Sequence, residues 1–269
     1  AEILHKKLNI YSPPDLRRWK QFIDNLRHPK KEITVAMCGK YTKLEDSYAS
    51  IIESFNHCAA HLGCKISLKW VETTDLKDTS FMDSVDGVLV PGGFGHRGTE
   101  GKIEAIRVAR ERNIPFLGLC LGLQLAVIEF ARHVCDLESA NSTEMDADTP
   151  HPVIDILPEQ KEIVDKGGTM RLGAYTAVLK EGTLVHSLYR STEVSERHRH
   201  RYEVNPDYHQ IITEKGMVFS GCSRDGRLVE FIELPDLKFF AATQAHPELK
   251  SRMELPSPLF YGFVKACLS

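Results

Sequence analysis

Hydrophobic positions in the first half of the chain fall into two alternating patterns. Short apolar runs typical of buried strands occupy residues 33–39, 65–71, 86–90 and 114–119. Apolar residues at helical spacing occupy about 47–62, 101–112 and 121–134. Strands that alternate with helices at this spacing predict an α/β fold: a doubly wound, mostly parallel central sheet with helices on both faces.

The pattern changes after about Asp136, where short strand-like pieces are separated by Gly, Pro and Asp. We expect additional antiparallel strands in this part, at residues 173–179, 217–223 and 228–234. Residues 238–244 predict a last core strand. A closing helix over 257–268 is indicated by Ser257-Pro258 at its start.

The N-terminal residues predict a lead-in helix. Pro13-Pro14 and Asp15 mark a helix start, and apolar residues then recur at helical spacing. These are Leu16, Trp19, Phe22, Ile23 and Leu26. With no repeats and no second composition regime, we expect a linker and lead-in helix over residues 1–30 and one domain over residues 31–269.

Composition narrows the class of protein. The chain has 269 residues, 42% of them hydrophobic, and a formal net charge of −3, which gives no global bias toward nucleic acid or an anionic membrane. Its seven cysteines are an odd number without a C-x-x-C pair, so we expect reduced thiols in the cytoplasm. The first residues lack the apolar core of a signal peptide, so we expect none, and no run of 18 apolar residues occurs.

One cysteine lies where a predicted strand turns into a predicted helix. The segment Gly118-Leu119-Cys120-Leu121-Gly122 has the form of a nucleophile elbow with sulfur as the nucleophile. Such a turn exposes the side chain at a helix N-terminus, where the dipole favours a thiolate. The alternatives are that Cys120 is a small core residue and that the glycines only allow close helix packing.

A thiolate nucleophile needs a base, and the oxyanion that it forms needs a second N–H donor; two further segments offer candidates for these groups. Gly92-Gly93 follows a predicted strand, where glycine lets a backbone N–H turn toward a ligand. His246 follows the last predicted strand, and Glu248 lies two residues further, able to fix the tautomer of the imidazole. Singly, a Gly-Gly pair is usually a turn and such a histidine a surface residue. All three segments lie at carboxyl ends of predicted strands, where open α/β sheets form their sites.

The segment "ERHRHRYE" raises the alternative of a metal site. His198 and His200 alternate with Arg197, Arg199 and Arg201, whose charges repel a cation, and no matching ligand cluster is spaced for a metal. We therefore expect no metal. On a strand, the three arginines would share one face.

Together these segments resemble a known family. The motifs "GLCLGLQ" and "HPE" are similar to those of the triad glutamine amidotransferases. The segments 39–55, 91–103 and 196–206 further resemble the glutaminase domains of the CTP synthase family, over essentially the whole chain from about Lys31.

The resemblance implies a set of site residues. Cys120, His246 and Glu248 would form the catalytic triad, and the backbone N–H groups of Gly93 and Leu121 the oxyanion hole. The residues implied to bind glutamine are Gly92, Gly93, Phe94, Leu121, Gln124, Glu144 and Arg201. The chemistry agrees, because an α-carboxylate suits an arginine and an α-ammonium suits a carboxylate.

The resemblance also implies what lies outside this chain. Members of the family carry a synthetase domain that binds ATP, UTP and magnesium, uses the ammonia to make CTP, mediates a homo-tetramer and responds to GTP as activator of the glutaminase. Here Lys40 is followed by Tyr41, so the phosphate-binding template G-x-x-x-x-G-K-[ST] fails, and no cofactor is expected in this domain. The alternatives are another cysteine hydrolase, such as a γ-glutamyl hydrolase, and a non-catalytic regulatory module.

Overall fold

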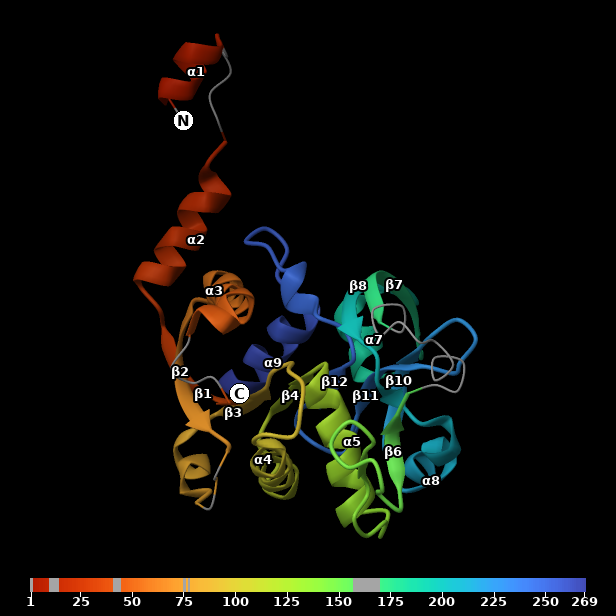
Figure 1. Ribbon diagram of the computed structural model, residues 1–269. Helices are drawn as coiled ribbons and strands as arrows, with labels where there is room; N and C mark the ends of the chain where they lie inside the picture. The colour runs from red at the N-terminus through yellow and green to blue at the C-terminus, as the bar shows by residue number, and fades with distance from the viewer. Residues whose placement is uncertain (1, 10–14, 41–44, 75, 77, 157–169) are drawn as a thin grey trace.

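A computed structural model describes residues 2–9, 15–40, 45–74, 76, 78–156 and 170–269 (Figure 1). Within these residues a nine-stranded sheet has the order β2-β1-β3-β4-β12-β11-β10-β7-β8. Its parallel part consists of β2 (Cys64–Glu72), β1 (Lys31–Gly39), β3 (Gly87–Val90), β4 (Phe116–Leu119) and β12 (Phe240–Thr243). The antiparallel part continues with β11 (Val229–Glu233), β10 (Val218–Cys222), β7 (Arg171–Leu179) and β8 (Glu193–His200).

Helices cover both faces of the sheet (Figure 1). On one face lie α3 (Ala49–Leu62), α7 (Leu184–Tyr189) and α9 (Pro258–Leu268), and on the other α4 (Thr99–Glu111) and α5 (Leu121–His133). Each face of the sheet has its own hydrophobic core. Adjacent residues of a strand pack into different cores, because successive side chains point to opposite faces. Leu89 packs in the core under α3 and α9, whereas Val88 packs in the core under α4 and α5.

The predicted α/β class is confirmed, as are the strands expected in the parallel part and the antiparallel strands expected after residue 170. The segment between residues 136 and 214 holds elements that the pattern did not define: β5 (Asn141–Ser142), β6 (Pro152–Asp155), β9 (Glu203–Val204) and α8 (His209–Glu214). The strands β5, β6 and β9 form a separate small sheet. With two residues each, β5 and β9 are too short to show a period.

The lead-in helix is present as α2 (Arg17–Arg27), and a short α1 (Glu2–Leu8) extends beyond it, away from the sheet (Figure 1). Phe22 is buried and stacks on His61 of α3, with ring centroids 4.6 Å apart. Asn25 donates to the Ala60 carbonyl at 2.7 Å. The other apolar residues expected on this helix, Leu16, Trp19, Ile23 and Leu26, remain exposed.

The composition led to expectations about membrane-spanning segments and about the cysteines, which can be compared with the structure. None of the helices in the described ranges has the length and apolar character needed to cross a membrane. All seven cysteines are free thiols, and all except Cys222 are buried.

Candidate active site

Cys120 occupies the turn between β4 and α5 in a strained conformation. Its φ of 52° and ψ of −100° lie where residues with a side chain rarely occur. The Cys120 N–H donates to the Thr243 carbonyl of β12 at 2.7 Å, which holds the turn in place. Such strain persists only where the surrounding structure imposes it, and it concentrates at functional sites.

Gly118 and Gly122, which flank Cys120, each lie too close to a neighbouring strand to carry a side chain. A Cβ on Gly118 would lie 2.8 Å from the Ala242 Cβ, and one on Gly122 would lie 2.3 Å from the Val90 carbonyl oxygen. Gly118 thus makes room for β12 and Gly122 lets α5 pack closely on β3. Close packing therefore explains the glycines, and the same packing forces Cys120 into the elbow conformation.

His246 and Glu248 lie just beyond β12, the strand next to β4. The His246 Nδ1 donates to the Glu248 Oε1 at 2.7 Å, and the His246 backbone N–H donates to the Arg197 carbonyl at 2.8 Å. Burial lowers the pKa of His246, but its hydrogen bonds and charge interactions with Cys120 and Glu248 outweigh burial and raise that pKa to about 10. The side chain of Cys120 therefore lies within reach of the His246 imidazole.

The Gly92-Gly93 turn closes the site from β3. A Cβ on Gly92 would lie 2.8 Å from the His246 Cε1 and 3.5 Å from the Cys120 Cβ, so this turn touches both residues. A Cβ on Gly93 would lie 3.4 Å from the Leu121 Cδ2. As the first residue of α5, Leu121 has a backbone N–H without an acceptor in its own helix.

The loop that follows this turn is tied at two points. The Gly95 N–H donates to the Glu144 Oε1 at 3.0 Å. The Lys40 Nζ donates to the Phe94 carbonyl and lies 4.6 Å from the centre of the Phe94 ring. The Phe94 side chain itself is 69% exposed. Residues 41–44, part of the segment 39–55 that resembles the family, lie outside the described residues.

A cavity of about 530 Å³ opens above the sulfur. It is lined by Gly93, Phe94, Cys120, Gln124, Glu144, Met170, Arg199, His200, Arg201, Tyr202 and His246. All the residues expected to bind glutamine line it except Leu121 and Gly92, and Gly92 lines another pocket together with His246 and Glu248. Sequence reasoning did not assign four of the lining residues to the site: Met170, Arg199, His200 and Tyr202.

The alternation expected for the arginines holds only in part. Arg197 and Arg199 are exposed on one face of β8, and His198 and His200 are buried on the other. The strand ends at His200, so Arg201 lies in the following bend and turns to the cavity. After this bend the chain enters the other sheet, where β9 begins at Glu203.

The buried face of β8 packs against an ionic cluster formed by residues of β7, β9 and β11. Arg171 donates to Glu203 at 3.2 Å and to Glu230 at 2.7 Å. The rings of His198 and His200 hydrogen-bond each other, with 3.0 Å between Nδ1 of the first and Nε2 of the second. The imidazoles thus satisfy one another beside a guanidinium instead of converging on a common point.

Burial sets the protonation of this cluster. It raises the pKa of Glu203 to about 8, against the opposing charge of Arg171. Burial, aided by the charge of Arg171, lowers the pKa of His198 to about 3. The pKa of His200 is also well below its usual value, mainly through burial. Both histidines are therefore neutral rings at neutral pH.

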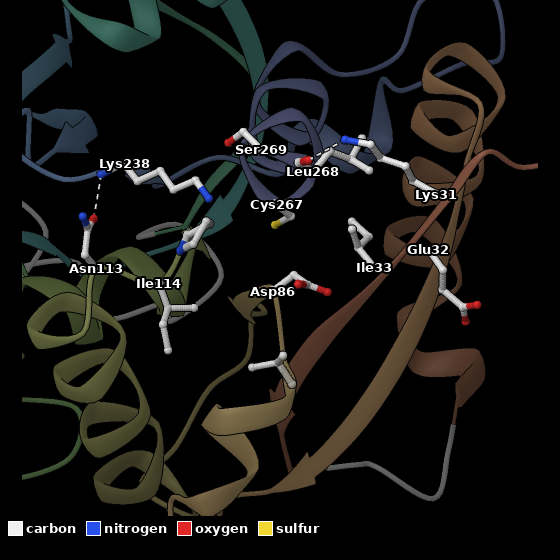
Figure 2. Close-up of a pocket in the computed structure, with 12 residues that line it drawn as sticks. Lys31, Glu32, Ile33, Asp86, Asn113, Ile114, Lys238, Cys267, Leu268 and Ser269 are labelled. Carbon is white, nitrogen blue, oxygen red and sulfur yellow. Dashed lines mark hydrogen bonds between the residues drawn. The ribbon is translucent and has the colours of Figure 1, made fainter.

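Another pocket, of about 510 Å³, lies at the opposite ends of the parallel strands, the amino ends (Figure 2). Its lining includes Lys31, Asp86, Ile114 and Lys238, which lie at or just before the amino ends of β1, β3, β4 and β12, and Cys267 of α9. None of the expected site residues lines it. The carboxyl ends of the strands, where Cys120 lies, are the usual location of sites in open α/β sheets.

Comparison with known proteins identifies relatives of this arrangement. Residues 43–266 match the family described as glutamine amidotransferase class-I. CTP synthases from Methanococcus maripaludis and Methanocaldococcus jannaschii are 53% and 54% identical over 278 residues. Each alignment spans 100% of this chain and 52% of the relative, so the chain spans about half the length of these relatives.

A solved structure resembles the fold as well. The glutaminase domain of Trypanosoma brucei CTPS with bound acivicin superposes with a TM-score of 0.81 at 36% sequence identity. The match covers 88% of this chain and 94% of the trypanosomal one.

Proposed function

The chain belongs to the class-I glutamine amidotransferase family, within the group of CTP synthase glutaminase domains, and from this premise we propose that it hydrolyses L-glutamine to glutamate and ammonia. The observation that carries this proposal is the convergence of Cys120, the His246–Glu248 pair and the Gly92-Gly93 turn at the ends of three adjacent parallel strands. These residues come from distant parts of the sequence, and only the fold brings them together.

The reaction proceeds through a thioester. The Cys120 sulfur attacks the side-chain amide carbon of glutamine, its proton passes to His246, and the N–H groups of Leu121 and Gly93 hold the tetrahedral oxyanion. His246 returns the proton to the leaving nitrogen, and ammonia departs. A water molecule then gives a proton to His246 and attacks the thioester carbon, which releases glutamate and the free thiol through a second oxyanion. Glu248 holds the imidazole in one tautomer throughout.

The polar groups around the cavity bind the part of glutamine that does not react. Arg201 binds the α-carboxylate and Glu144 the α-ammonium, with Phe94, Gln124 and the backbone of Gly92-Gly93 as the other contacts. Both charged side chains line the same cavity as the Cys120 sulfur. A carboxylate and a guanidinium that line one cavity suit a zwitterionic amino acid.

The whole protein has a second half that this chain does not contain. We assign residues 1–30 to the linker and residues 31–269 to the glutaminase domain. A synthetase domain in the same polypeptide binds ATP, UTP and magnesium and uses the ammonia to make CTP. It also forms the tetramer and relays activation by GTP, and the protein works in the cytoplasm. This context is supported by the relatives, about twice as long as the chain, and by the free thiols.

Assay of glutamate and ammonia tests the proposed function. The chain alone is expected to hydrolyse glutamine slowly, and the longer polypeptide with the synthetase domain, ATP, UTP and GTP considerably faster, because packing against the Gly92-Gly93 loop fixes the oxyanion donors. A γ-glutamyl peptide is the comparison substrate. Faster hydrolysis of that peptide than of glutamine would indicate a γ-glutamyl hydrolase, and equal rates for the chain and the activated longer protein would reject the role of the partner domain.

Replacement of Arg201 tests the binding assignment. Arg201→Ala is expected to raise the KM for glutamine by about 10- to 100-fold with little change in kcat, because the guanidinium grips a carboxylate equally in ground and transition states. Steady-state kinetics measure both constants, with Arg112→Ala, at an exposed arginine paired with Asp83, as the control. A loss confined to kcat would contradict the assignment.

A further inference from the structure

The side-chain amide of Gln244 lies against the sulfur of Cys120, and no step of the reaction described above uses it. Gln244 follows β12 directly, and its backbone N–H donates to the Glu230 carbonyl at 2.9 Å. Its side chain is completely buried, and its Nε2 lies 3.7 Å from the Cys120 Sγ. A buried amide must find its hydrogen-bond partners within the protein, so its neighbours determine its orientation.

The orientation of the Gln244 amide is set by the backbone carbonyl of Tyr202, to which it is linked through the side-chain amide of Gln124. The Tyr202 carbonyl oxygen can only accept, so the Gln124 atom that faces it at 3.0 Å is the Nε2. The same Nε2 lies 3.3 Å from the side-chain amide of Gln244, and its second hydrogen requires an acceptor there. The Oε1 of Gln244 therefore faces Gln124, and its Nε2 faces the sulfur.

We propose that Gln244 is a further catalytic residue, which donates an N–H hydrogen bond to the Cys120 thiolate. Its orientation is set by an amide relay, defined as the Tyr202 carbonyl, the Gln124 amide and the Gln244 amide. A thiolate accepts a hydrogen bond more strongly than a neutral thiol does, so this donor favours the ionised nucleophile. The sulfur thus has a donor on the side of β12 besides the imidazole of His246.

The first member of the amide relay is held from its other side by β8. The His200 Nδ1 donates to the Tyr202 carbonyl at 3.1 Å, so the proton of this neutral ring is on Nδ1. The Nε2 of His200 then accepts from the Nδ1 of His198 at 3.0 Å. Because these rings are buried, the Tyr202 carbonyl is fixed before any ligand enters the cavity.

The amide relay also defines what Gln124 offers to a ligand. Both hydrogens of its Nε2 are donated within the protein, so the side chain presents its Oε1 as an acceptor. An acceptor suits the ammonium or amide hydrogens of glutamine, a consequence that rests on the proposed function.

Alkylation of Cys120 by iodoacetamide tests the proposal without glutamine. Gln244→Met, which keeps the length of the side chain and removes the donor, is expected to slow alkylation at pH 7 by about tenfold. The difference should shrink at high pH, where the sulfur is ionised in both proteins. Gln210→Met, at an exposed glutamine bonded to Glu214, is the matched control and should react at the original rate. Peptide mass spectrometry identifies the modified cysteine, and circular dichroism checks the fold.

A double substitution tests whether Gln124 acts through Gln244. Gln124→Met alone should slow alkylation by a smaller factor, since Gln244 keeps its amide but loses the neighbour that orients it. Gln124→Met combined with Gln244→Met should react as slowly as Gln244→Met alone. Unchanged alkylation in Gln244→Met at all pH values, or factors that multiply in the double variant, would overturn the proposal.

The unsubstituted chain provides a test that does not depend on the folding of a variant. In protein labelled with 15N-glutamine, the side-chain amide signal of Gln244 should shift when the pH ionises Cys120, whereas that of Gln210 should not. A Gln244 signal that stays constant would refute the hydrogen bond. Neither measurement requires turnover, so a chain that shows the shift and the slowed alkylation but does not hydrolyse glutamine would refute the proposed function alone.

Discussion

Replacement of Cys120 by alanine is expected to abolish glutamine hydrolysis, a loss of about 10⁴-fold or more in kcat, while the fold stays intact. Without the sulfur no thioester can form, and the remaining groups only bind and polarise the amide. The fold should survive because alanine and cysteine both carry a Cβ, so the strain at a φ of 52° is similar for the two residues.

Glutamate release and a thermal unfolding curve check the two halves of this prediction. Cys135→Ala, at another buried free thiol outside the cavity, is the control and should keep its activity. In the unsubstituted chain, a glutamine-like diazo-ketone should label Cys120 alone and stoichiometrically. An active Cys120→Ala variant, or labelling at Cys38 or Cys222, would show that the nucleophile is wrongly assigned.

Replacement of His246 by alanine is expected to lower kcat by roughly 10³-fold or more, because general acid and base steps at both stages are lost. Glu248→Gln should cost less, roughly 10- to 100-fold, because the amide oxygen can still accept the hydrogen bond from Nδ1 and orient the ring. The pKa of about 10 at His246 depends on its interactions with Cys120 and Glu248. The pKa of the imidazole should therefore be lower in Glu248→Gln.

Steady-state kinetics and the pH titration of the His246 ring by NMR measure these effects. His28→Ala, at an exposed histidine of the N-terminal segment, is the control for the loss of an imidazole. Equal losses in kcat for the two variants, or a larger loss for Glu248→Gln, would contradict the division of roles. An unchanged pKa of His246 in Glu248→Gln would show that the charge of Glu248 does not raise it.

The sequence was most informative where the chemistry is local along the chain. Gly118, Cys120 and Gly122 form a motif within five positions, and His246 and Glu248 lie two residues apart, so each group stood out as a candidate by its spacing. The parallel sheet was equally accessible, because its buried strands appear as apolar runs that alternate regularly with amphipathic helices. The carboxyl ends of the predicted strands then indicated where the candidate site should lie.

The features that the sequence did not reveal depend on which strands are neighbours in the fold. Gln244 stands only two residues before His246, but its importance comes from β12 lying beside β4, and this pairing leaves no trace in the period of either strand. The Tyr202 carbonyl is a backbone group, which residue type does not reveal. The buried partners of His198 and His200 come from β7, β9 and β11, so their burial beside Arg171 could not be foreseen from the alternating histidines and arginines.

The position of β12 has a consequence for the order of assembly. This strand is the last of the large sheet along the sequence, yet it lies between β4 and β11, near the middle. A chain during synthesis therefore carries Cys120 long before the strand that positions His246, and closure of the sheet requires contacts between segments more than a hundred residues apart. Until β12 inserts, the edge of β4 is unpaired and the thiol has no base. The proposed pair of Cys120 and His246 thus comes together only when the sheet is complete, so the proposed nucleophile gains its base at the last step of sheet formation.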